Sequence, residues 1–112
     1  NGGTVTFRAF WVGNATTDGI AWGLQAISVG DNAEADAAFG TAVVVTDDSQ
    51  GDATEVLVTA TSGALTISGA GDDKMTFFQI FRDVSDANDD MAADARLVGI
   101  QLFFTTDATN DA

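Results

Sequence analysis

Carboxylates supply most of the reactive side chains in this 112-residue sequence, which has 17 acidic residues, four basic residues and no His or Cys. Ser-His, Cys-His and His-metal arrangements are therefore excluded. Two carboxylates can form a glycosidase site, but no pair here stands in a motif that separates an acid from a nucleophile. No Gly-rich loop precedes a helix to cradle a phosphate. The sequence predicts a protein that is not an enzyme.

The most specific group of carboxylates lies in residues 83–95, between two strongly apolar runs. Hard cations such as Ca²⁺ bind clustered carboxylate and carbonyl oxygens, so this loop is a candidate calcium site. The EF-hand order of acids, with a Gly at its sixth position, is absent. The candidate metal ligands are Asp86, Asp89 and Asp90.

The same loop also has a structural interpretation, which we expect to be the correct one. Asp89 or Asp90 would cap a helical turn through residues 91–93, because Asp is a preferred residue at helix N-termini. Arg82 and Arg96 flank the loop and would pair with its carboxylates, pinning the chain where it crosses between strands. The candidate partners in these salt bridges are Asp83, Asp86, Asp90 and Asp94.

Aromatic residues offer a different kind of site. Trp11 and Trp22 could form a stacking platform for sugars, but both lie on apolar strand faces, so we expect them in the core. Phe10 and Phe78 fall on the opposite strand faces from Trp11 and Phe77. They are expected to be exposed unless a subunit covers them, which makes them candidate interface residues. The expected core residues are Trp11, Trp22, Phe77, Phe81, Ile100 and Leu102.

Short apolar runs separated by Gly, Asp, Asn and Ser turns predict seven strands that position these residues. The first two strands, joined by a short polar loop, are expected to pair antiparallel. Residues 30–40 are expected to be mostly loop, with Phe39 tucked inward. The predicted strands span residues 4–12, 20–29, 41–46, 55–61, 64–68, 75–82 and 96–106.

This pattern predicts a single all-β domain over residues 1–112, an antiparallel β-sandwich with a jelly-roll-like arrangement of about seven or eight strands. A jelly roll needs eight strands. One strand is therefore expected to lie upstream or to come from a neighbouring chain. The chain starts with Asn1-Gly2-Gly3, without an initiator Met or a signal peptide. We expect it to be part of a longer or processed product.

The formal net charge of −13 limits the partners of this chain. Such a charge repels phosphate and anionic membranes, so neither nucleic acid nor membrane is expected to bind. No run of about 18 apolar residues could span a bilayer. The lack of Cys removes disulfides and thiolate metal sites. No cofactor is expected, with calcium as the only alternative.

A set of strand edges and loop acids resembles a known type of module. The set comprises Trp11, residues 64–69, Phe81, Arg82, Asp83, Asp86, Asp89, residues 94–97 and Gly99. Over residues 3–106 this is similar to a module of structural proteins of tailed, particularly marine, bacteriophages. The family-like pattern often has Thr-Leu where this chain has Asp90 and Met91, and no ligand residues follow from the resemblance.

The resemblance implies a β-sandwich in a virion surface component, such as a fibre, a spike or a capsid decoration protein. Such components are usually multimers, so a homo-oligomer is expected, preferably a trimer, in contact with other virion proteins. One alternative is a module at a fibre tip that binds a receptor or a host-surface glycan. Another is a Ca²⁺-stabilised extracellular adhesin domain unrelated to phage.

Overall fold

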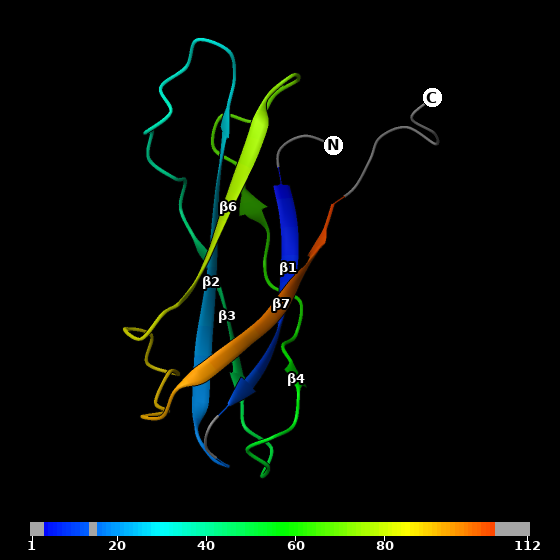
Figure 1. The fold of residues 1–112 in the computed structure, drawn as a ribbon, viewed down its shortest axis with the longest axis vertical. Coiled ribbons are helices and arrows are strands. Elements are labelled where there is room, and N and C mark those ends of the chain that lie inside the picture. Colours follow the sequence, from blue (N-terminus) through cyan, green and yellow to red (C-terminus); the bar gives the residue numbers. More distant parts are fainter. Residues whose placement is uncertain (1–3, 14–15, 105–112) are drawn as a thin grey trace.

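The computed structural model describes residues 4–13 and 16–104, which form seven strands in two antiparallel sheets (Figure 1). The antiparallel β-sandwich expected from the sequence is confirmed, and a jelly-roll arrangement stays a prediction. No helix within these two ranges is long and apolar enough to cross a membrane. The strands are β1 (Thr4–Gly13), β2 (Gly19–Val29), β3 (Val43–Asp48), β4 (Leu57–Val58), β5 (Leu65–Thr66), β6 (Met75–Arg82) and β7 (Ala95–Phe103).

Strands β1 and β2 are the central strands of the two sheets. In the four-stranded sheet, β1 pairs with β7 along one edge and with the short strands β4 and β5 along the other edge. In the three-stranded sheet, β2 lies between β3 and β6. The expected pairing of the first two strands is therefore wrong. Both strands have a strongly apolar face, and these faces contribute to one core from opposite sheets instead of lying side by side in one sheet.

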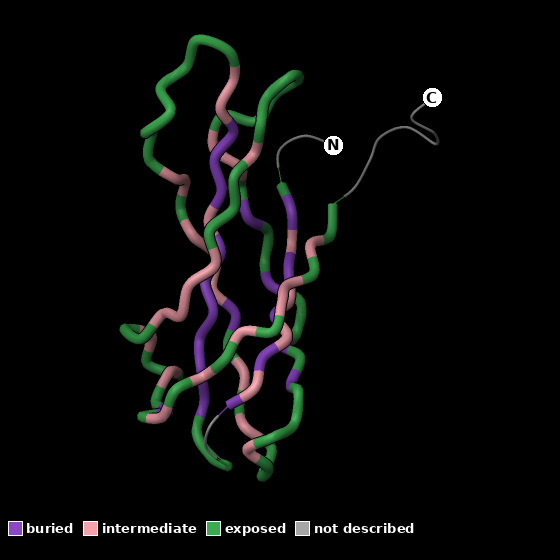
Figure 2. The backbone as a smooth tube through the Cα atoms, viewed as in Figure 1, coloured by how far each residue is buried: buried purple, intermediate pink, exposed green. Residues whose placement is uncertain are grey.

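The core is built from the inner faces of these two central strands (Figure 2). Trp11 is 0% exposed and Trp22 is 5% exposed, which confirms their expected burial and is incompatible with a sugar platform made from both. Ile100 and Leu102 of β7 are partly buried and pack against the core, as expected. The buried residues of β1 and β2 in this core are Val5, Phe7, Ala9, Trp11, Ile20, Trp22, Leu24 and Ala26.

The two faces of β6 are reversed from the prediction. Phe78 lies opposite Ala26 of β2 in the register, so it shares the core-facing side, although it is 36% exposed. Phe77 lies on the outer side and is 47% exposed, so its expected place in the core is wrong. Phe81 also lies on the outer side and is half-buried. Its ring covers Gly23, where an added Cβ would overlap the ring.

The segment from β4 to β5 follows β1 without forming one continuous strand. Its register on β1 shifts twice, from Leu57 opposite Trp11 to Leu65 opposite Val5. At the two shifts a buried hydroxyl takes the place of a backbone carbonyl. Thr59 Oγ1 accepts from Ala9 N and Ser62 Oγ accepts from Phe7 N, both at 3.0 Å. The predicted strands 55–61 and 64–68 are thus reduced to two short pieces.

The connection between β2 and β3 crosses over the three-stranded sheet. As expected, it is mostly loop, and residues 31–38 are all exposed. Phe39 is half-buried and lines an open hollow of about 360 Å³ together with Phe77 and Phe78. At the far end of the chain, β7 stops at Phe103, and the predicted end of that strand at residue 106 lies outside the described residues.

Candidate functional site

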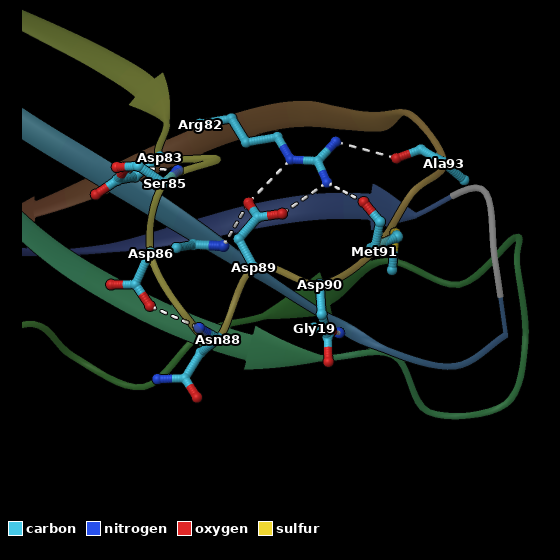
Figure 3. Close-up of polar contacts among 11 residues, drawn as sticks. Gly19, Arg82, Asp83, Ser85, Asp86, Asn88, Asp89, Asp90, Met91 and Ala93 are labelled. Carbon is cyan, nitrogen blue, oxygen red and sulfur yellow. Dashed lines mark hydrogen bonds and ion pairs between the residues drawn. The ribbon is translucent and has the colours of Figure 1, made fainter.

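The acidic loop between β6 and β7 is held by one bidentate ion pair (Figure 3). Arg82 Nη2 donates to Asp89 Oδ1 at 2.8 Å, and Arg82 Nε donates to Asp89 Oδ2 at 2.9 Å. The Asp89 side chain is only 2% exposed and that of Arg82 is 21% exposed. Arg82 also donates to the carbonyl oxygens of Met91 at 2.5 Å and Ala93 at 3.0 Å. One guanidinium therefore fixes the path of the returning chain.

The ion pair shifts the pKa of both partners. The hydrogen bonds from Arg82 are the main cause that lowers the pKa of Asp89, and the backbone N–H of Ala21 lowers it further, while burial opposes both. The hydrogen bond to Asp89 raises the pKa of Arg82, and the charges of Asp89 and Asp94 add to this. Both groups are therefore held in their charged forms.

Two carboxylates of this loop replace the carbonyls of a missing strand along β2. Asp89 Oδ2 accepts from Ala21 N at 3.1 Å, and Asp90 Oδ1 accepts from Gly19 N at 2.7 Å. Met91 N then donates to Gly19 O at 3.0 Å, and the Met91 side chain is buried in the core. The loop is thus an irregular extension of β6 that completes the edge of β2.

The remaining loop residues do not take the roles predicted for them. Asp83 and Asp86 accept hydrogen bonds from Ser85 N and Asn88 N within tight turns, and neither pairs with Arg82. Arg96 is exposed and makes no ion pair within the part of the chain that the structure describes. Asp94 supports Arg82 by charge alone.

The expected helical turn is also wrong, because residues 91–93 contain neither helix nor turn, only a bend at Ala93. Turns form instead at residues 84–85 and 87–88. The partner of Arg82 is Asp89, which the sequence had indicated as a metal ligand or a cap. Both alternatives overlooked that the start of β2 needs acceptors for its free N–H groups.

The candidate calcium ligands do not converge on one point. Asp86 accepts from the backbone of its own turn, while Asp89 binds Arg82 and Asp90 binds Gly19 N. Within residues 4–13 and 16–104, no group of three or more carboxylates is placed to hold a metal ion. The geometry of this loop indicates a structural role, in which the carboxylates hold the loop against β2 and Arg82.

The second feature is the outer face of the four-stranded sheet, which we call the contact face. Residues directly opposite each other in antiparallel strands lie on the same side of the sheet. The register places Val58 and Gly99 opposite Phe10. It also places Gln101 opposite Arg8 and Phe103 opposite Thr6. The contact face therefore comprises Thr6, Arg8, Phe10, Val12, Val58, Arg96, Gly99, Gln101 and Phe103.

Arg8 contacts three neighbouring side chains on the contact face. Its Nε donates to Gln101 Oε1 at 2.8 Å. Its Cζ lies 5.6 Å from the centroid of the Phe10 ring and 5.7 Å from that of Phe103, within the range of cation–π contact. Val58 is 39% exposed and Phe103 is 37% exposed beside it. Aromatic rings and an ordered guanidinium thus form one exposed surface.

The contact face carries no acidic residue, although the whole chain has 17. The only acids within the seven strands are Asp47 and Asp48, at the end of β3 in the other sheet. Two of the four basic residues, Arg8 and Arg96, lie on the contact face. Its surface is therefore apolar and cationic on a strongly acidic molecule.

The sequence prediction found only part of this face. Phe10 was expected to be an exposed interface residue, and the structure places it half-buried between Arg8 and Val58. The alternation of residues 4–12 placed Arg8 on the same side as Phe10, but β7 could be aligned with them only through the register. Phe78, the other candidate, lies on the opposite sheet.

No protein-family model, curated protein or solved structure is significantly similar to this chain.

Proposed function

We propose that the chain is a non-enzymatic structural subunit that packs its contact face against other subunits. The observation that carries this proposal is an apolar, cationic face without acids on a chain of net charge −13. The chain lacks His, the commonest general base, and Cys, a strong nucleophile, which agrees with a structural role.

The composition of the contact face is typical of a protein–protein interface. The cores of interfaces are depleted in charged residues and enriched in aromatic residues and Arg. Like charges on two copies repel each other, so an association of acidic subunits needs a surface from which carboxylates are absent. The contact face meets this requirement with two Phe rings and an exposed Val at its centre.

The resemblance to structural modules of tailed bacteriophages supplies the setting for this proposal. The subunit would form part of a virion surface as a fibre, a spike or a capsid decoration protein. It would assemble as a homo-oligomer, preferably a trimer, and contact other virion proteins. Support for this setting comes from the sequence pattern together with the β-sandwich fold.

A matched pair of variants tests the contact face. Val58→Glu places a carboxylate on it, and Val84→Glu places one on the loop after β6, where Val84 is 70% exposed. Light scattering should show a multimer for the unmodified chain and for Val84→Glu, and a mass near 11.5 kDa for Val58→Glu. Thermal melting checks that each variant is folded. Equal masses for the two folded variants would contradict the proposal.

A further inference from the structure

Three acids of the β2–β3 connection complement the contact face. Residues 31–38 read Asp-Asn-Ala-Glu-Ala-Asp-Ala-Ala and are exposed throughout. Asp31, Glu34 and Asp36 form no ion pair or side-chain hydrogen bond with any residue that the structure describes. The loop therefore offers carboxylates separated by small apolar side chains, the counterpart of a face that offers guanidinium groups beside Phe and Val.

The two surfaces lie on different sheets of one molecule. Ala35 and Ala37 line the hollow with Phe77, on the side of the three-stranded sheet. Arg8 and Arg96 point outward from the four-stranded sheet, with the core between them and the three-stranded sheet. Figure 1 shows the cyan connection beside β6 and β2, away from β4. The loop cannot reach the contact face of its own chain.

We infer that residues 31–38 of one copy dock on the contact face of a second copy, in a head-to-tail assembly. The inference rests on the proposed function and adds the identity of the partner. A contact between two different surfaces of identical subunits is heterologous, so it closes into a ring or extends as a filament. Arg8 and Arg96 would receive the carboxylates, while the alanines pack over Phe10 and Val58.

Charge reversal with matched controls tests the docking. Arg96→Glu alters the face, and Lys74→Glu makes the same change in charge in the turn before β6. Glu34→Lys with Asp36→Lys alters the loop, and Asp72→Lys with Asp73→Lys makes the same change elsewhere. Each reversal places like charges opposite each other across the interface, and such a juxtaposition is costly. Each reversal on the face or the loop should therefore weaken self-association at least about tenfold, which corresponds to about 1.4 kcal/mol.

A combined variant provides the decisive measurement. Arg96→Glu together with Glu34→Lys and Asp36→Lys restores opposite charges across the contact, so self-association should return towards that of the unmodified chain. Both controls should associate normally in sedimentation experiments at low salt. If Val58→Glu dissociates the assembly but the charge reversals weaken self-association no more than their controls do, the head-to-tail inference is overturned. The proposal that the contact face binds another subunit is then retained. If the unmodified chain never associates, the proposed function fails as well.

Discussion

At the residue scale, one carboxylate connects an ion pair with the edge of a sheet. Asp89 receives two hydrogen bonds from Arg82 and one from the backbone of β2. A buried ion pair is costly to break on one side, because the remaining charge stays uncompensated. Asp89 is therefore the position in this loop where a substitution should do most harm.

Asp89→Asn should lower the free energy of unfolding by roughly 3 kcal/mol, since it leaves Arg82 without its charge partner. Asp86→Asn is the matched control, because the Asp86 carboxylate accepts only a turn N–H. Its effect should stay below about 1 kcal/mol. Urea denaturation of both variants measures the difference, and equal losses would show that the ion pair does not lock the loop.

The lowered pKa of Asp89 also predicts a dependence of stability on pH. The carboxyl binds protons less readily in the folded chain than in the unfolded chain, where its pKa is about 3.9. Its contribution is present above that value and is lost as the pH falls through the lower folded pKa. Denaturation from pH 7 down to about pH 3 should show the onset of this loss, with a smaller slope in Asp89→Asn. Identical slopes would contradict the assignment.

The sequence indicated that Arg82 would bind the loop, but it did not identify the carboxylate. Five acids follow Arg82 within the next 12 residues, and spacing alone ranks them equally. The choice depends on Ala21 and Gly19, whose N–H groups need acceptors where β6 ends. That requirement exists only after the strands are paired.

At the element scale, side-chain oxygens complete sheet edges where the backbone is irregular. Thr59 and Ser62 do this for β1 as Asp89 and Asp90 do for β2. Each hydroxyl also donates to a neighbouring carbonyl, so each buried hydroxyl both accepts and donates a hydrogen bond. The register shifts of the β4–β5 segment depend on these two residues.

Thr59→Val and Ser62→Ala should each lower the free energy of unfolding by about 1 to 3 kcal/mol, because each leaves a buried N–H of β1 without an acceptor. Thr61→Val, at an exposed position between them, should change it by less than about 0.5 kcal/mol. Chemical denaturation of the three variants measures this ranking. A loss for Thr61→Val as large as the others would contradict the role of the hydroxyls.

The limits of prediction at this scale follow from strand pairing. Alternation predicted the inner face of β1 correctly, because polar and apolar residues alternate from Thr4 to Ala9. In β6 both Phe77 and Phe78 are apolar, so alternation could not assign their sides. Gly23 decided the outcome, since it leaves room for the Phe81 ring on the outer side.

At the scale of the whole molecule, the acids of residues 4–13 and 16–104 lie almost entirely in connections between strands. Outside β3, no described strand contains Asp or Glu. Most of the negative charge that the structure describes therefore lies in the loops, while the outer face of the four-stranded sheet carries none. The composition gives the net charge and predicts that the chain repels nucleic acid and anionic membranes. Only the fold shows that one sheet face carries no acidic residue.

The measurement that tests the central claim most directly is the mass of the unmodified chain in solution, determined by light scattering over a range of protein concentrations. The subunit-contact account predicts a stable multiple of 11.5 kDa, with a trimer as the preferred state. Because the contact face is apolar at its centre, assembly should persist at physiological salt. A folded chain that stays at 11.5 kDa at every concentration would contradict the account.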